Sequence, residues 1–360
     1  MLLGFAPGAA LGVGRFAYAL VLPAMQSALG LTYAQAGLLG SANTVGYLVG
    51  ALLSHALLYR VGYRRGFYGA LLLQVPTLLL CALAPNLGVL LALRFVQGVG
   101  GAVVFVGGAA LLLARGAKAF GTGLYFGGVG LGILASPLAL VLAPSWRHAW
   151  ALLAVLSLLL SVVAFLPYQS LSQPAPQASR RESSLRPIVW LLVAYGLYGA
   201  GYIGYMTFVT SGLGVALGPF WLVLGVGASL TGLLWGPWLA RVGGGAGMLH
   251  ILLVLALASA LPIVLTLPWL SAFAFGISFL GVITALTDVF RRLLPPGAWA
   301  SAMGASTAVF ALGQAVGPSL SGLAGDLAGG VEGALWLSTG LLVLALVAAL
   351  LHRVSRAYLT

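Results

Sequence analysis

The chain has 360 residues, of which 61% are hydrophobic and only 6% are charged, and its mean hydropathy is +1.11. These charges are too few to cover a soluble protein of this size, so the composition excludes a water-soluble globular protein. The net charge of +12 would suit a nucleic-acid-binding protein, but the positions of the basic residues argue against that class.

Long apolar runs with almost no charge predict transmembrane helices, because about 20 such residues cross the ~30 Å hydrocarbon core of a bilayer. The runs are continuous rather than alternating, which argues against transmembrane strands. Twelve spans are predicted, at residues 6–28, 33–58, 66–84, 87–114, 119–142, 146–167, 187–211, 219–240, 247–267, 269–292, 298–324 and 332–352.

One long polar segment, residues 168–186, is rich in Pro, Ser, Gln and Arg and predicts a cytoplasmic linker. The expected protein is an all-α polytopic membrane protein with an N-terminal six-helix bundle at 1–167 and a C-terminal six-helix bundle at 187–360. Span 1 lacks a basic start and a cleavage signal, so it is expected to be retained.

The basic residues set the orientation. Arg15 and Arg94 fall inside spans, and Arg147 lies between spans 5 and 6. The other thirteen all fall in loops from an even span to an odd one, or at the C-terminus: Arg60, Arg64, Arg65, Arg115, Lys118, Arg180, Arg181, Arg186, Arg241, Arg291, Arg292, Arg353 and Arg356. This asymmetry follows the positive-inside rule and predicts that both termini are cytoplasmic.

The two halves of the chain resemble each other at an offset of 181 residues. The tripeptide Arg60-Val61-Gly62 then aligns with Arg241-Val242-Gly243, while three single residues align in the fifth and eleventh spans: Gly123 with Gly304, Gly132 with Gly313, and Pro137 with Pro318. Two parallel repeats of six spans predict a binding site near the membrane midplane, between the halves.

Arg15 is a permanent cation near the middle of span 1, with no acidic residue nearby. A charge at mid-bilayer costs about 2.5–3.5 kcal/mol on insertion scales, so it must face protein or water. Three interpretations stay open: a structural bond to backbone carbonyls, snorkelling to the surface, or an anion site in a central cavity. A guanidinium forms two parallel bonds with a carboxylate or phosphate, which favours the anion site. Tyr18, three residues on, would share that site.

Two further spans carry candidate binding residues. Arg94 and Gln97 share a face of span 4, where Arg94 is either structural or part of the site. Span 7 places four tyrosines on one helical stripe, which suits an amphipathic ligand as well as simple packing. The tyrosines are Tyr195, Tyr198, Tyr202 and Tyr205, and in span 10 Phe275, Ser278 and Phe279 would form the opposite wall.

Asp288 is the acid expected within the second half's spans. It is interpreted either as a proton carrier or, with Arg241, Arg291 and Arg292 close by, as part of a cytoplasmic gate closed by an ion pair. Gln314 and Asn43 are expected to bond neighbouring helices, and His55 to be a bonded interior histidine.

Known enzyme and metal motifs do not occur in the sequence. It has no H-E-x-x-H motif, no nucleotide-binding loop, and a lone cysteine, Cys81. No enzyme activity, metal or cofactor is therefore expected.

Several motifs resemble the major facilitator superfamily of secondary transporters. They are "YRVGYRR" at 59–65, with Tyr59 where the family signature has Asp, "RFVQG" at 94–98, "WRHAW" at 146–150 and "GQAVGPSLSG" at 313–322. "GVGRFAYALVLPAM" in span 1 is similar to the uncharacterised bacterial YbfB-like branch, which implies a location in the inner (plasma) membrane of a bacterium.

The resemblance implies that spans 1, 4, 7 and 10 line a central cavity. It also implies that Arg60 and Arg64, in the loop after span 2, act in gating together with Asp288 and Arg241, and that Arg94 takes part in coupling or in bonds to span 1.

The expected function is secondary active transport of a small organic anion or amphipathic solute by alternating access. Coupling would be proton symport, with the proton on the substrate or on Asp288. The expected partners are a small-molecule substrate, protons and the lipid bilayer, with no nucleic acid, and the protein is expected to be a monomer. The alternatives are a drug or lipophilic-compound efflux antiporter and, from another class, a membrane receptor or scaffold that binds without transport.

Overall fold

The computed structural model describes residues 2–114, 119–167, 186–211, 216–294 and 299–357, and within these ranges the regular elements are helices. Most of the predicted linker, 168–185, lies outside the described residues. The first group of helices consists of η1 (Leu2–Gly4), α1 (Phe5–Pro7), η2 (Gly8–Phe16), α2 (Tyr18–Leu29), α3 (Tyr33–Val61), α4 (Tyr63–Leu83), α5 (Leu87–Ala114), α6 (Ala119–Ala135), α7 (Pro137–Leu142) and α8 (Trp146–Phe165).

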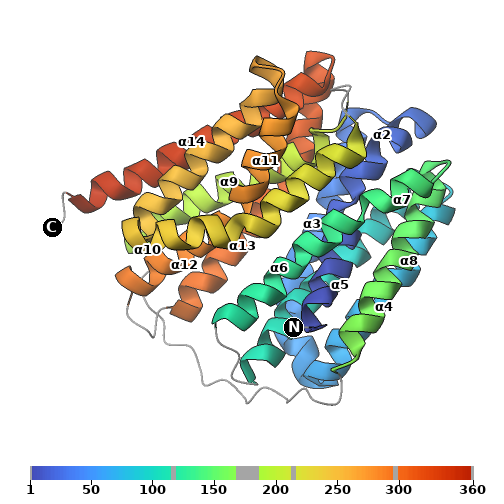
Figure 1. Ribbon diagram of the computed structural model, residues 1–360, viewed down its shortest axis with the longest axis horizontal. Coiled ribbons are helices and arrows are strands. Elements are labelled where there is room, and N and C mark those ends of the chain that lie inside the picture. The colour runs from blue at the N-terminus through green and yellow to red at the C-terminus, as the bar shows by residue number, and fades with distance from the viewer. Residues whose placement is uncertain (1, 115–118, 168–185, 212–215, 295–298, 358–360) are drawn as a thin grey trace.

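The second group begins after the linker. It consists of η4 (Arg186–Ile188), α9 (Val189–Phe208), α10 (Leu217–Val264), α11 (Pro268–Phe279), α12 (Gly281–Leu293), α13 (Trp299–Ala328) and α14 (Val331–Ala357). The two groups lie side by side, with the blue-to-green helices on one side of the molecule and the yellow-to-red helices on the other (Figure 1).

Ten helical stretches within the described residues are long and apolar enough to cross a membrane. The 48-residue stretch Leu217–Val264 contains two spans, because the backbone at Gly243 is not helical (φ 78°, ψ 157°). Helix α13 has 30 residues, about 45 Å at 1.5 Å per residue, which also exceeds the hydrocarbon core. When the stretch Leu217–Val264 is counted as two spans and α13 is added, the ten stretches become twelve, as predicted.

The repeated tripeptide marks the same backbone feature in both halves. Gly62 separates α3 from α4 with φ 90° and ψ 132°, and Gly243 divides α10 with φ 78° and ψ 157°. A positive φ of this kind favours glycine, which has no Cβ to clash. The offset of 181 residues therefore reflects two equivalent breaks between consecutive spans.

Glycines at equivalent positions also bring the first and fifth spans of each half together. A Cβ on Gly132 would overlap the carbonyl oxygen of Gly8, and a Cβ on Gly313 would overlap that of Gly196. Helices in lipid pack through such small residues because backbones can then approach closely. The packing of span 1 on span 5 is thus repeated by span 7 on span 11.

Span 1 is not a uniform α-helix. Residues Gly8–Phe16 form a π-helix, and the α-helical geometry resumes at Tyr18. Such segments are rare and occur mostly at functional sites. Arg15 lies in the last turn of this π-helix.

We expect Gly132→Ala and Gly313→Ala each to destabilise the protein by about 1–3 kcal/mol, because the added methyl group would force two backbones apart. Thermal unfolding in detergent, followed by circular dichroism, measures the change. Gly69→Ala is the matched control, since a Cβ there meets nothing within 4 Å. Unchanged melting temperatures for both tested variants would contradict the packing.

Candidate functional site

Arg15 is buried between the two groups of helices, with 7% of its surface exposed. Its guanidinium carbon lies 5.0 Å from the ring centroid of Tyr47 and 5.6 Å from that of Phe16. The Nε and Nη2 atoms are buried and have no hydrogen-bond partner. The side chain therefore neither snorkels nor bonds carbonyls through these two atoms, and it keeps a two-pronged donor free for an anion.

Arg94 is also buried, with 2% of its surface exposed, but it has a different environment. Its Nη1 donates to the carbonyl of Gly14 (2.7 Å) and to Oε1 of Gln97 (2.8 Å), and its Nη2 donates to the carbonyl of Arg15 (3.3 Å). A π-helix leaves carbonyls without ordinary helical partners, and the guanidinium supplies donors to two of them. Arg94 and Gln97 thus hold the backbone that presents Arg15.

A polar network supports this arrangement on spans 2, 3 and 4. Asn43 donates to the carbonyl of Arg94 (3.0 Å), Gln74 donates to the carbonyl of Gln97 (3.2 Å), and Gln97 donates to the Cys81 sulfur (3.5 Å). Tyr18 belongs to the same region, because its hydroxyl donates to the carbonyl of Ala36 (2.7 Å) and its ring lies 4.8 Å from the Arg94 guanidinium. The structure thus places Tyr18 beside Arg94.

The predicted tyrosine stripe faces an aromatic stack in the second group. Tyr195, Tyr198 and Tyr202 each stack on Phe310 of α13, at centroid distances of 4.6, 5.6 and 5.7 Å. Tyr202 also stacks on Phe279 of α11 at 6.0 Å. These rings bring spans 7, 10 and 11 together on one aromatic wall.

Two tyrosines of α9, Tyr198 and Tyr205, also bond to α11. Helix α11 ends at Phe279, and the Tyr198 hydroxyl donates to the Phe279 carbonyl. Tyr205 stacks on Phe275 at 4.0 Å, and its hydroxyl bonds Ser271. Tyr205 and Phe275 therefore join α9 to α11.

A closed ring of contacts surrounds Arg15, and we call it the Arg15 ring. On one side, Arg15 lies over Tyr47, Tyr47 follows Thr44 by one helical turn, and the Thr44 hydroxyl donates to the Gln314 carbonyl (2.8 Å). On the other side, Gln314 bonds the Tyr202 hydroxyl, Tyr202 stacks on Phe279, and Phe279 contacts Phe16 at 6.2 Å. The seven members come from both groups of helices: Arg15, Phe16, Thr44, Tyr47, Tyr202, Phe279 and Gln314.

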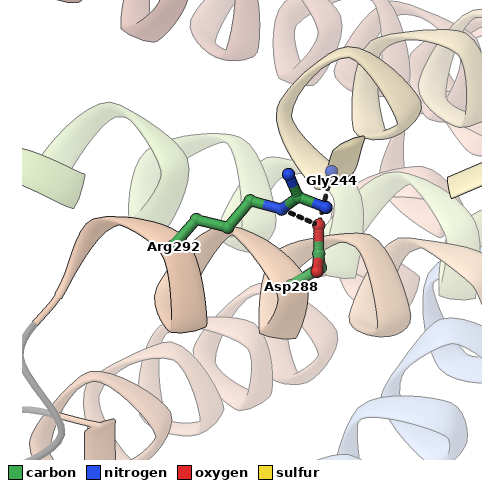
Figure 2. Close-up of polar contacts among 3 residues, drawn as sticks. All are labelled: Gly244, Asp288 and Arg292. Carbon is green, nitrogen blue, oxygen red and sulfur yellow. Dashed lines mark hydrogen bonds and ion pairs between the residues drawn. The ribbon is translucent and has the colours of Figure 1, made fainter. Parts of the chain in front are cut away.

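Asp288 does not join this ring in the described contacts. Its carboxylate accepts from Arg292 (2.7 Å) and from the backbone N–H of Gly244 (2.8 Å), as Figure 2 shows. All three residues belong to the second group, so this ion pair stabilises the start of the span after Gly243. Of the other gating candidates, Arg60 and Arg241 are exposed and Arg64 is partly buried.

A contact between the groups lies at the Tyr33 end of α3. The Asp326 carboxylate, at the end of α13, accepts from the backbone N–H groups of Tyr33 (2.8 Å) and Ala34 (2.9 Å). Free N–H groups at a helix N-terminus favour a negative charge. Ser319 donates to Ser41 (2.8 Å) on the same pair of helices, which adds a further bond between the groups.

Sequence reasoning missed Asp326, Tyr47 and Phe310, and it treated Gln314 only as a bond between helices. The signal for Asp326 was an acid at the end of span 11, in a chain with four acidic residues. The signal for Tyr47 was an aromatic residue one turn after the polar pair Asn43 and Thr44.

Two groups of membrane-spanning helices, which share an internal repeat, meet at a buried arginine and a set of stacked aromatic side chains. This architecture is that of a secondary transporter.

Comparisons with known proteins agree with this class. Residues 8–350 match the family described as the uncharacterised MFS-type transporter YbfB. The chain therefore belongs to the YbfB-type family of major facilitator superfamily transporters. This is a family of transporters and not of enzymes.

Solved structures share the fold. The nucleoside transporter NupG matches with a TM-score of 0.73 and 15% identity, over 97% of each chain. A bacterial homologue of the human lysosomal transporter Spinster, in an inward-facing and unoccupied conformation, matches with a TM-score of 0.68 and 16% identity, over 98% of this chain and 95% of that one.

A curated relative is the gentisate transporter of Corynebacterium glutamicum. It is 30% identical over 180 residues, which make up 49% of this chain and 40% of that transporter. The similarity thus spans less than half of each protein.

We expect Arg94→Met to destabilise the protein by about 2–4 kcal/mol, because it leaves the Gly14 and Arg15 carbonyls without these donors. Thermal unfolding measures this loss, and Arg65→Gln, in an exposed position, is the control for lost charge. A melting temperature for Arg94→Met equal to that of Arg65→Gln would show that the bonds to span 1 contribute nothing.

We expect Asp326→Asn to weaken the contact at the Tyr33 end of α3 by about 0.5–2 kcal/mol, since a neutral amide interacts less with the helix N-terminus. The population ratio of separated to closed groups should then rise by about two- to thirtyfold. Spin-label distances across that end, measured in nanodiscs, report the ratio. Glu332→Gln is the charge-matched control. Equal distance distributions in the two variants would show that Asp326 does not hold the two groups of helices together.

Proposed function

We propose that this transporter moves a small aromatic organic anion by alternating access, with Arg15 binding the anionic group. The observation that carries the proposal is the pair of buried, unpartnered guanidinium atoms, Nε and Nη2, between the two groups of helices. A buried charge without a partner is costly, and a carboxylate would satisfy both donors at once.

The aromatic wall supports an aromatic substrate. Tyr202 and Phe279 lie within 6.0 Å of each other, and Phe16 meets Phe279 edge-on at 6.2 Å beside Arg15. Rings in such positions stack on an aromatic group while the guanidinium holds its anionic end. The relative named as a gentisate transporter, an aromatic organic anion transporter, agrees with this chemistry.

The finer topology belongs to the same proposal. The basic residues in the loops from even to odd spans support cytoplasmic termini, and the family supports the plasma membrane of a bacterial cell. We propose that the protein acts as a monomer. Each half acts as a six-helix domain, and the two rock about the Arg15 ring. The Tyr33 end of α3 then faces the outside, so the Asp326 contact closes the outer side.

We further propose that transport is proton symport. Asp288 is bonded to Arg292 and to the N–H of Gly244 within the second group, and a carboxylate held by Arg15 stays ionised, so the proposal assigns the proton to neither group. Substrate uptake that does not respond to an imposed proton gradient would contradict proton symport.

We expect Arg15→Ala to lower the uptake of labelled gentisate into proteoliposomes by at least about thirtyfold, and Arg15→Lys by about tenfold, because lysine keeps the charge but loses the fork. Arg353→Ala, which removes an exposed charge, is the control and should transport normally. Undiminished uptake in both Arg15 variants would refute the mechanism. Uptake of lipophilic cations in place of anions would favour the efflux alternative.

A further inference from the structure

Gln314 has an unused hydrogen-bond acceptor in the Arg15 ring. Its side chain is 1% exposed, and its Nε2 donates to the Tyr202 hydroxyl. Its backbone carbonyl accepts from Thr44. Its Oε1, however, is buried and has no partner. A buried amide oxygen without a donor lowers the stability of the protein, and a donor on a bound ligand would remove that cost.

The ring places Gln314 on the far side from Arg15. Gln314 is reached from Arg15 through Tyr47 and Thr44 of α3 in one direction, and through Phe16, Phe279 and Tyr202 in the other. A substrate that entered between the two groups of helices here would meet the guanidinium at one end and the amide at the other, with aromatic rings between them.

The two ends have opposite hydrogen-bonding character. Arg15 offers two unpartnered donors, whereas Gln314 offers one unpartnered acceptor. A second unpartnered acceptor, Oδ1 of Asn43, lies one turn before Tyr47 on α3. A neutral amide oxygen accepts from a hydroxyl group without repelling an anion held nearby.

We infer that Gln314 determines specificity, and that its Oε1 accepts a hydrogen bond from a ring hydroxyl of the substrate whose carboxylate binds Arg15. The inference rests on the proposed function and narrows it to hydroxylated aromatic carboxylates. A site built to bond a hydroxyl discriminates against the analogue that lacks it, because the buried acceptor is then left unpaired.

The test compares three ligands of the purified full-length protein by isothermal titration calorimetry: benzoate, gentisate and 2,5-dimethoxybenzoate. Gentisate has hydroxyl donors, whereas the dimethoxy compound has only acceptors at the same ring positions. The wild-type protein should bind gentisate at least about tenfold more tightly than either of the other two. Equal binding of gentisate and 2,5-dimethoxybenzoate would overturn the inference.

Two variants separate recognition from packing. Gln314→Met keeps a similar volume without the acceptor, so the preference for gentisate should fall to within about twofold while benzoate still binds. Gln26→Met makes the same exchange at a partly buried glutamine outside the Arg15 ring, so the preference should remain within about twofold of the wild-type ratio. A preference that survives in Gln314→Met would overturn the inference.

The same titrations distinguish this inference from the proposed function. Benzoate binding that is lost in Arg15→Ala but shows no hydroxyl preference would overturn the role of Gln314 and leave the anion site in place. If none of the three carboxylates bound to the wild-type protein, the proposed function would fail, and the specificity role of Gln314 would fail with it.

Discussion

The main constraint on this structure is the burial of the Arg15 guanidinium with two N–H groups unpaired. Burying a guanidinium is costly, so the burial of Arg15 must be compensated by what surrounds it. Here the compensation is partial: two aromatic faces lie within 6 Å of the guanidinium, while Nε and Nη2 have no partner. A site that is incomplete in this way gains most from an anion, and binding would then link the two groups of helices that contribute to the Arg15 ring.

The remaining polar contacts serve to hold that side chain in place. Arg94 donates to the carbonyls of Gly14 and Arg15, and Asn43 in turn donates to the carbonyl of Arg94. Closely packed glycines, such as Gly132 against Gly8, let span 1 approach its neighbours. The two intramembrane arginines are therefore not equivalent: one is bound to the backbone, and the other is left open.

The sequence was sufficient for the spans, the repeat and the family, because each depends on local composition or on motifs along the chain. The stripe of Tyr195, Tyr198 and Tyr202 could also be derived, since helical spacing fixes which residues share a face. Helical spacing does not say which helix that face will meet. Phe310, Tyr47 and Asp326 were therefore missed, as their roles arise from contacts between spans that are far apart in sequence. The anchoring of span 1 by Arg94 depends on a π-helix, which the hydrophobic pattern did not reveal.

The π-helix in span 1 also has a consequence for how the chain tolerates changes in length. A π-turn contains one residue more than an α-turn, so removal of a single residue between Gly8 and Phe16 could restore regular α-geometry without shifting the flanking helices. The residues on either side of the segment would then keep the faces they present, and only side chains within the segment, Arg15 among them, would change direction. Shortening this segment by one amino acid would thus change how Arg15 points, while the rest of span 1 would still pack and span the bilayer.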